Sequence, residues 1–319
     1  MSKKYYIAAD GGGTKLQAIL YDENFNVIRT QKTSGVNSLY KPRDVVEKNI
    51  DSLIDDLLAG EIKEIESADV CLVMHDNYFE TSLKSRCEVK NFSFHSEPSA
   101  ALGAAFERSG VVALCGTGSD AFSVLSDRSY FRVGGWGPLF GDEGSGYDIG
   151  LQAFKAAFWD SDGRGRHTVI TDMIKDKWNV SDVWDLIGYF AKNSDARHEI
   201  ASAALIVSQA AANGDEVALD IFRYSADQMA ICTNTAIRRF GDDWNGIVVT
   251  MGNAWKGHPV IFEDFCKKVL AEYPRANILH PVFDPVIGCV VQRCFDEGLA
   301  TQDFKEKILV GFKDFIYKI

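Results

Sequence analysis

The 319-residue sequence predicts an α/β protein made of two successive α/β lobes. Strand-like and helix-like segments alternate along the chain, which is the pattern of a layered α/β fold. Two glycine-rich turns, beginning at residues 10 and 115, each lie between two strand-like segments, so one local arrangement occurs twice. At roughly 100–200 residues per domain, the length also fits two domains.

The first lobe is predicted to cover residues 1–110. Its strand-like segments are short apolar or alternating runs. Its first helix is expected behind Pro42, where apolar residues recur at helical spacing. We expect strands at residues 5–9, 16–21, 27–29, 69–74 and 89–94, and helices at residues 46–57 and 98–108.

The second lobe is predicted to cover residues 111–299, and without a Pro- or Gly-rich linker near residue 110 we expect a hinge between the lobes. A large helical insertion is predicted at about residues 144–240, where the pattern is almost entirely helical. A last helix, at about residues 300–319, could pack back on the first lobe. We expect strands at residues 111–114, 121–125, 130–133 and 247–251, and helices at residues 258–272 and 303–317.

Composition disfavours several classes of partner. The net charge of −11 disfavours nucleic acid and anionic membranes. No apolar run approaches the ~18 residues of a membrane span, and no signal peptide is visible. The seven cysteines include no C-x-x-C pair, which argues against zinc and against an all-cysteine iron–sulfur site within one chain. We therefore expect reduced thiols and a cytoplasmic protein.

The first glycine-rich turn is Asp10-Gly11-Gly12-Gly13-Thr14-Lys15. Its glycines permit positive φ and leave no side chain in the way of a phosphate, and successive N–H groups can form an anion-binding concavity. Thr14 adds a hydroxyl donor, and Asp10 could hold Mg²⁺ through water. A plain tight hairpin is the alternative.

The second turn, Cys115-Gly116-Thr117-Gly118-Ser119-Asp120, repeats this chemistry, with Thr117 and Ser119 as hydroxyl donors. Two such hairpins facing each other would hold a polyphosphate from both sides. A third turn, Gly252-Asn253, follows the strand expected at residues 247–251, and Gly252 would let an adenine ring lie against the backbone. An ordinary strand-to-helix turn is the alternative here.

These three turns in this order resemble the actin-like ATPase clan, and within it the N-acetylglucosamine kinases and the BadF/BadG-type ATPases. The most specific stretch runs from Gly134-Gly135-Trp136-Gly137 into Gly141-Asp142-Glu143-Gly144-Ser145-Gly146. The similarity extends over residues 5–298. It implies two actin-like, ribonuclease H-like lobes with a nucleotide cleft between them, ATP and Mg²⁺ as cofactors, a hexosamine-type sugar such as N-acetylglucosamine as acceptor, and a homodimer.

The loop of residues 134–146 contains six glycines, which suits a backbone that approaches a ligand closely. Trp136 could stack on a sugar or an adenine, while Asp142 and Glu143 either cap the following helix or contact a sugar hydroxyl or Mg²⁺ through water. The resemblance favours sugar contacts by Gly135, Trp136, Gly137, Asp142 and Glu143.

Three first-lobe positions bear on the acceptor. Asn37 matches an Asn that contacts the sugar in the acetylglucosamine kinases, the alternative being a loop Asn that bonds local backbone. Those kinases have a catalytic Asp where this chain has Glu97, expected at or near a helix N-cap before Pro98. A displacement of ~1 Å at such a base can cost ~10²-fold in rate. Met74 and His75 replace the family's Gly/Ser-rich turn.

Both departures, at Glu97 and at Met74-His75, lie on the acceptor side, so ATP binding is the firmer prediction. A sugar kinase with Glu97 and Asp10 as catalytic residues is the first hypothesis. The alternatives are a BadF/BadG-type ATPase without a sugar acceptor, because Glu97-Pro98-Ser99-Ala100-Ala101 also resembles the heat-shock chaperone ATPases, and a catalytically impaired nucleotide- or sugar-binding protein. No cysteine lies in a glycine-rich loop suited to the iron–sulfur cluster of the dehydratase-activating members.

Overall fold

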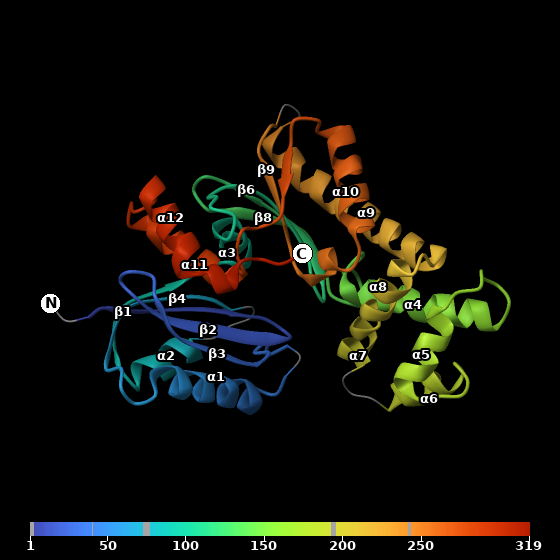
Figure 1. The fold of residues 1–319 in the computed structure, drawn as a ribbon, viewed down its shortest axis with the longest axis horizontal. Helices are drawn as coiled ribbons and strands as arrows, with labels where there is room; N and C mark the ends of the chain where they lie inside the picture. The colour runs from blue at the N-terminus through green and yellow to red at the C-terminus, as the bar shows by residue number, and fades with distance from the viewer. Residues whose placement is uncertain (1–2, 40, 73–76, 193–195, 242–243) are drawn as a thin grey trace. The chain divides into compact units, whose positions relative to one another are not determined.

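The computed structural model describes residues 3–39, 41–72, 77–192, 196–241 and 244–319. The chain forms two compact units, each with its own five-stranded sheet (Figure 1). The first unit comprises Met1–Ser109, Ser126–Arg128 and His280–Lys318, and the second comprises Gly110–Leu125, Ser129–Leu279 and Ile319. Met74 and His75 lie outside the described residues.

The first sheet has the order β3-β2-β1-β4-β5. Strands β1 to β3 are antiparallel, whereas β4 and β5 run parallel to β1. Since Ile7, Ala8 and Ala9 are completely buried, β1 is the apolar centre of this unit. The strands are β1 (Tyr5–Gly11), β2 (Lys15–Asp22), β3 (Val27–Ser34), β4 (Glu64–Leu72) and β5 (Glu88–Phe94).

Helices cover both faces of this sheet. Figure 1 shows α1 (Arg43–Leu58) and α2 (Tyr78–Lys84) on one side, and α11 (Pro285–Asp296) and α12 (Gln302–Gly311) on the other. Helix α11 packs on β1, β4 and the short α3 (Glu97–Gly103). The two helices approach so closely that a Cβ at Gly288 would lie 1.8 Å from the carbonyl oxygen of Ala100. The sequence-based division had placed α11 in the second lobe.

Two predicted helices end earlier than expected. Helix α3 stops at Gly103, not at residue 108, because Phe106 adopts a left-handed φ of 61°. The last helix is interrupted at Phe312, which is completely buried with its ring on Tyr21 and Phe25, and a separate 3₁₀ turn, Lys313–Phe315, follows.

The second sheet repeats the topology of the first, in the order β10-β9-β6-β7-β8. Strands β6 to β8 are antiparallel, and β9 and β10 run parallel to β6. The predicted pair of successive α/β lobes is therefore confirmed. The strands are β6 (Gly110–Cys115), β7 (Ser119–Val124), β8 (Tyr130–Gly134), β9 (Ile247–Met251) and β10 (Asn277–Leu279).

The predicted helical insertion separates β8 from β9 in sequence. Its longest member, α9, packs on β6, β7 and β8. Within the described residues, no helix is both long and apolar enough to cross a membrane. The helices of this unit are α4 (Gly146–Ser161), α5 (Ile170–Trp178), α6 (Asp185–Ala191), α7 (Ala196–Ser202), α8 (Ala204–Ala212), α9 (Glu216–Ile237) and α10 (Pro259–Glu272), with 3₁₀ turns at Arg238–Phe240 and Asn253–Lys256.

Candidate functional site

The first glycine-rich turn joins β1 to β2 and is open on its outer side. The N–H of Gly12 donates to the carbonyl oxygen of Lys15 at 3.0 Å, which closes the hairpin. A Cβ on Gly12 or Gly13 would meet no atom within 4 Å, whereas one on Gly11 would lie 2.7–2.9 Å from three apolar side chains. None of these three glycines adopts the positive φ that glycine permits. The glycines therefore provide room rather than an unusual backbone conformation.

Asp10 is the penultimate residue of β1, beside Cys71 on the parallel strand β4. Burial raises the pKa of Asp10 from 3.8 to about 6. Lys15 and a hydrogen bond from the Cys71 thiol oppose this pKa rise, while the carboxylate of Asp284 adds to it. Asp284 is the N-cap residue of α11, and sequence reasoning missed it. Two carboxylates in one neighbourhood offer the oxygen ligands that Mg²⁺ prefers.

Glu97 lies in the same neighbourhood as Asp10. Burial raises the pKa of the Cys71 thiol, and the charges of both Asp10 and Glu97 raise it further. Of the two positions expected for Glu97, at the N-cap of α3 or next to it, the structure shows the second. Ser96 is the N-cap residue, since its hydroxyl accepts a hydrogen bond from the Ser99 N–H at 3.3 Å, and Glu97 is the first helical residue.

Asn37 is buried in the loop after β3. Its side-chain oxygen accepts a hydrogen bond from the Leu39 N–H at 2.9 Å, an Asx-type turn. The side-chain oxygen of Asn37 is thus used in a local hydrogen bond, and its amide nitrogen is the group that can donate to a ligand.

The second glycine-rich turn is docked on the start of α4. The Gly146 N–H donates to the carbonyl oxygen of Gly116 at 2.8 Å, and the Tyr147 N–H donates to that of Thr117 at 3.2 Å. The Ser119 hydroxyl donates to the carbonyl oxygen of Glu143 at 2.7 Å, so it stabilises the loop. Thr117 is half-buried, and its hydroxyl stays a candidate donor to phosphate.

The third turn packs directly on the second. Gly252 has a φ of 113°, and a Cβ there would lie 2.3 Å from the carbonyl oxygen of Cys115. Asn253 follows with an exposed side chain. The structure thus brings Gly252 against the Cys115–Gly116 peptide, so the second and third turns are in direct contact.

The loop of residues 134–146 places Asp142 against the second turn. The Asp142 side chain is buried, and a Cβ on Gly118 would lie 2.9 Å from its Oδ1. Its Oδ2 accepts a hydrogen bond from Arg197 Nη2 at 2.9 Å. Helix α4 is capped by Ser145 and not by Asp142 or Glu143. The capping alternative is therefore wrong, and Arg197 joins the site as a residue that no sequence motif had identified.

Trp136 is 70% exposed at the tip of this loop, between Gly135 and Gly137, both of which have positive φ. The Arg132 guanidinium lies 5.8 Å from the centre of the indole. Glu143 has an exposed side chain. The loop therefore presents a solvent-facing aromatic surface next to the buried Asp142 carboxylate, a combination that suits a sugar ring.

Comparison with known proteins agrees with these features. The model of the BadF/BadG/BcrA/BcrD ATPase family matches residues 9–292. The chain belongs to this family.

Two relatives of the chain are 27% identical to it. One is an N-acetylmuramic acid/N-acetylglucosamine kinase of Clostridium acetobutylicum, aligned over 90% of this chain and 97% of the relative. The other is an N-acetyl-D-glucosamine kinase of Dictyostelium discoideum, aligned over 91% and 98%. Among solved structures, a putative N-acetylglucosamine kinase of Porphyromonas gingivalis superposes with a TM-score of 0.70 at 15% identity, covering 92% of this chain and 99% of that one.

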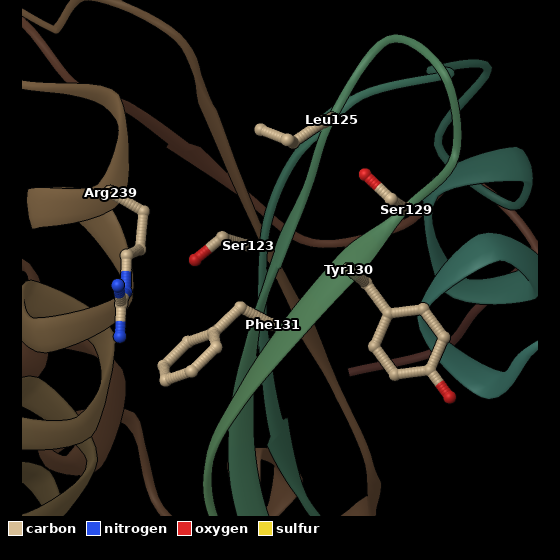
Figure 2. Close-up of a pocket in the computed structure, with 6 residues that line it drawn as sticks. All are labelled: Ser123, Leu125, Ser129, Tyr130, Phe131 and Arg239. Carbon is tan, nitrogen blue, oxygen red and sulfur yellow. The ribbon is translucent and has the colours of Figure 1, made fainter.

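A pocket of about 280 Å³ lies at the other end of the β7–β8 hairpin from Gly134 (Figure 2). Two of its lining residues are in contact, since the Arg239 guanidinium lies 3.7 Å from the centre of the Phe131 ring. None of its lining residues matches a motif of this ATPase family, so we do not assign it to nucleotide or sugar. They are Ser123, Leu125, Ser129, Tyr130, Phe131 and Arg239.

Proposed function

We propose that this protein is an ATP-dependent kinase that phosphorylates a hexosamine-type sugar such as N-acetylglucosamine. The observation that carries the proposal is that Asp10 stands beside Cys71 on the neighbouring strand and that the charges of both Asp10 and Glu97 act on the Cys71 thiol, so a candidate base accompanies a candidate metal-binding carboxylate. The names of the two relatives support the same acceptor class.

In the first unit, Gly11, Gly12, Gly13, Thr14 and Lys15 would bind phosphate oxygens, with Asp10 holding Mg²⁺ through water. Asp284 is a second carboxylate whose charge acts on Asp10, so it could also contact that ion. Bound Mg²⁺ would neutralise negative charge on the phosphates. In the second unit, Gly116, Thr117 and Gly118 would bind phosphate, and Gly252 and Asn253 would border the adenine.

Glu97 would remove the proton of the attacking sugar hydroxyl. The sugar oxygen then forms its bond to the γ-phosphorus while the bond to the β–γ bridging oxygen breaks, and ADP leaves. Asn37, Gly135, Trp136, Gly137, Asp142 and Glu143 would hold the sugar.

Acceptor-dependent ADP release tests the proposal. Mg-ATP is supplied with hexoses, hexosamines or N-acetylhexosamines, and a reaction without sugar is the control. We expect ADP release to depend on a hexosamine-type sugar. Equal release with and without every sugar would refute the kinase and favour the BadF/BadG-type ATPase alternative.

Glu97 variants test the assignment of the base. Glu97→Gln should lower the acceptor-dependent kcat by roughly 10²–10⁴-fold and leave the KM for ATP nearly unchanged, because a general base contributes about that factor. Glu97→Asp keeps a carboxylate and should retain far more activity than Glu97→Gln. Glu88→Gln, at an exposed position of the same unit, is the matched control. If the Glu97 variants behave like the intact protein, Glu97 is a helix-start residue without a catalytic role.

A further inference from the structure

Asp120 is a buried carboxylate with an unsatisfied oxygen. It is the second residue of β7, directly after the phosphate turn, and it pairs in register with Gly134 on β8. The residue is 9% exposed, and its Oδ1 is shielded from solvent with no hydrogen-bond partner among the residues described. Its Oδ2 faces the Gly135 backbone, since a Cβ on Gly135 would lie 2.8 Å from it. The carboxylate is thus directed at the turn that carries Trp136.

The neighbouring Asp142 shows that this loop can pair a buried carboxylate. Asp142 accepts a hydrogen bond from Arg197 at 2.9 Å. The cationic side chain whose charge acts on Asp120 is Arg132, and its guanidinium lies over the Trp136 ring. Burial raises the pKa of Asp120 to about 7, Arg132 opposes this pKa rise and Asp142 adds to it. Buried ionised groups are as a rule paired or hydrogen-bonded. A cationic donor would therefore satisfy this carboxylate.

We propose that Asp120 makes the acceptor site selective for a hexosamine with a free ammonium group, such as glucosamine, over its N-acetyl form. The inference rests on the proposed sugar-kinase function and narrows its substrate. An ammonium offers three donors and a positive charge, whereas an acetamide offers one N–H and a carbonyl oxygen that a carboxylate repels. The exposed Trp136 indole, in the turn that Asp120 faces, would attract the same cation through its π face.

The decisive experiment compares kcat/KM for glucosamine and N-acetylglucosamine in the intact protein and in Asp120→Asn. We expect the intact protein to prefer glucosamine by about tenfold or more, and Asp120→Asn to reduce that ratio by roughly 10- to 100-fold, because a hydrogen bond to a charged group is lost. Asp172→Asn, an exposed acidic position of the same unit, should leave the ratio unchanged.

Three outcomes separate the possibilities. A preference for N-acetylglucosamine in the intact protein, or a ratio that Asp120→Asn does not change, overturns the assignment of Asp120 while the kinase stands. Absence of phosphorylation with every sugar overturns the kinase itself and the selectivity with it. Asp120→Ser and the melting temperatures of both variants show whether a change in ratio comes from misfolding.

Discussion

Gly252→Ala tests the contact between the third turn and the second, on which the proposed nucleotide site of the second unit depends. The methyl group would lie 2.3 Å from the Cys115 carbonyl oxygen and 2.8 Å from the Gly116 nitrogen, both of them backbone atoms that cannot rotate away. The φ of 113° is also one that an L-residue rarely adopts. Backbone strain of about 1–3 kcal/mol adds to overpacking of about 1–3 kcal/mol. We expect a loss of roughly 2–6 kcal/mol in the free energy of unfolding.

Substitutions at two other glycines of the same unit separate the cost of backbone strain from the cost of overpacking. Gly214 has a φ of 82°, and a methyl group added there would meet no atom within 4 Å, so Gly214→Ala should cost only the left-handed backbone penalty of about 1–2 kcal/mol. Gly188 lies within α6, has ordinary φ and open space, and Gly188→Ala should stabilise the helix by about 0.5–1 kcal/mol.

The assay is urea unfolding followed by tryptophan fluorescence, combined with the KM for ATP. Trp255 is a built-in reporter because it is 1% exposed and its indole N–H donates to the Ala113 carbonyl oxygen at 3.2 Å, beside the turn. Gly252→Ala should also raise the KM for ATP, since relief of the overlap displaces the Cys115–Gly116 peptide. If Gly252→Ala loses no more stability than Gly214→Ala, the close approach of the two turns is not present in solution.

Two further predictions concern the phosphate side. Asp10→Asn should abolish turnover yet raise the free energy of unfolding by about 2–3 kcal/mol at pH 7.5, because the folded pKa of about 6 exceeds the ordinary 3.8. The folded carboxyl of Asp10 binds its proton more tightly than the unfolded one, so the intact protein loses about this much free energy of unfolding as pH rises from about 4 to about 6. Urea titrations at several pH values should therefore show that the stability gained by Asp10→Asn disappears below about pH 4. A gain that does not depend on pH would contradict the raised pKa as its cause. Thr117→Val keeps the side-chain shape and should raise the KM for ATP about tenfold or more, through loss of a hydrogen bond to phosphate worth about 1.5–3 kcal/mol. Unchanged kinetics would place Thr117 outside the site.

Local signals made most of the fold predictable. A strand, a glycine turn and a second strand are adjacent in sequence, so Asp10–Lys15 and Cys115–Asp120 could be located without any tertiary information. Strand β10 was not predicted because its three residues, Asn277–Leu279, are too few to show an alternating pattern. The early end of α3 depends on the left-handed Phe106, which no propensity reveals.

The contacts within the candidate site were far less predictable, because they join residues distant in sequence. Arg197 reaches Asp142 across 55 positions, and the Asp284 charge acts on Asp10 from the far end of the chain. The Ser119 hydroxyl, expected to bind phosphate, instead donates to the Glu143 carbonyl oxygen. Residue type and position in a motif identified the candidate residues. Their burial and their hydrogen-bond partners within the protein decide which of these side chains can contact a ligand.

The two sheets share one strand order, so the β1–β2 and β6–β7 hairpins occupy equivalent positions in their units. Their turns nevertheless differ in physical character. The first has open space at Gly12 and Gly13 and ends β1 in a carboxyl whose pKa is raised to about 6. The second is fixed by the α4 start and by Gly252. The same strand arrangement thus occurs with two kinds of turn. The first turn follows an acidic residue that is a candidate metal ligand, whereas the second is held in place by its contacts and follows Cys115, the last residue of β6. Substitutions at the first turn should therefore act mainly on kcat, and those at the second mainly on the affinity for ATP.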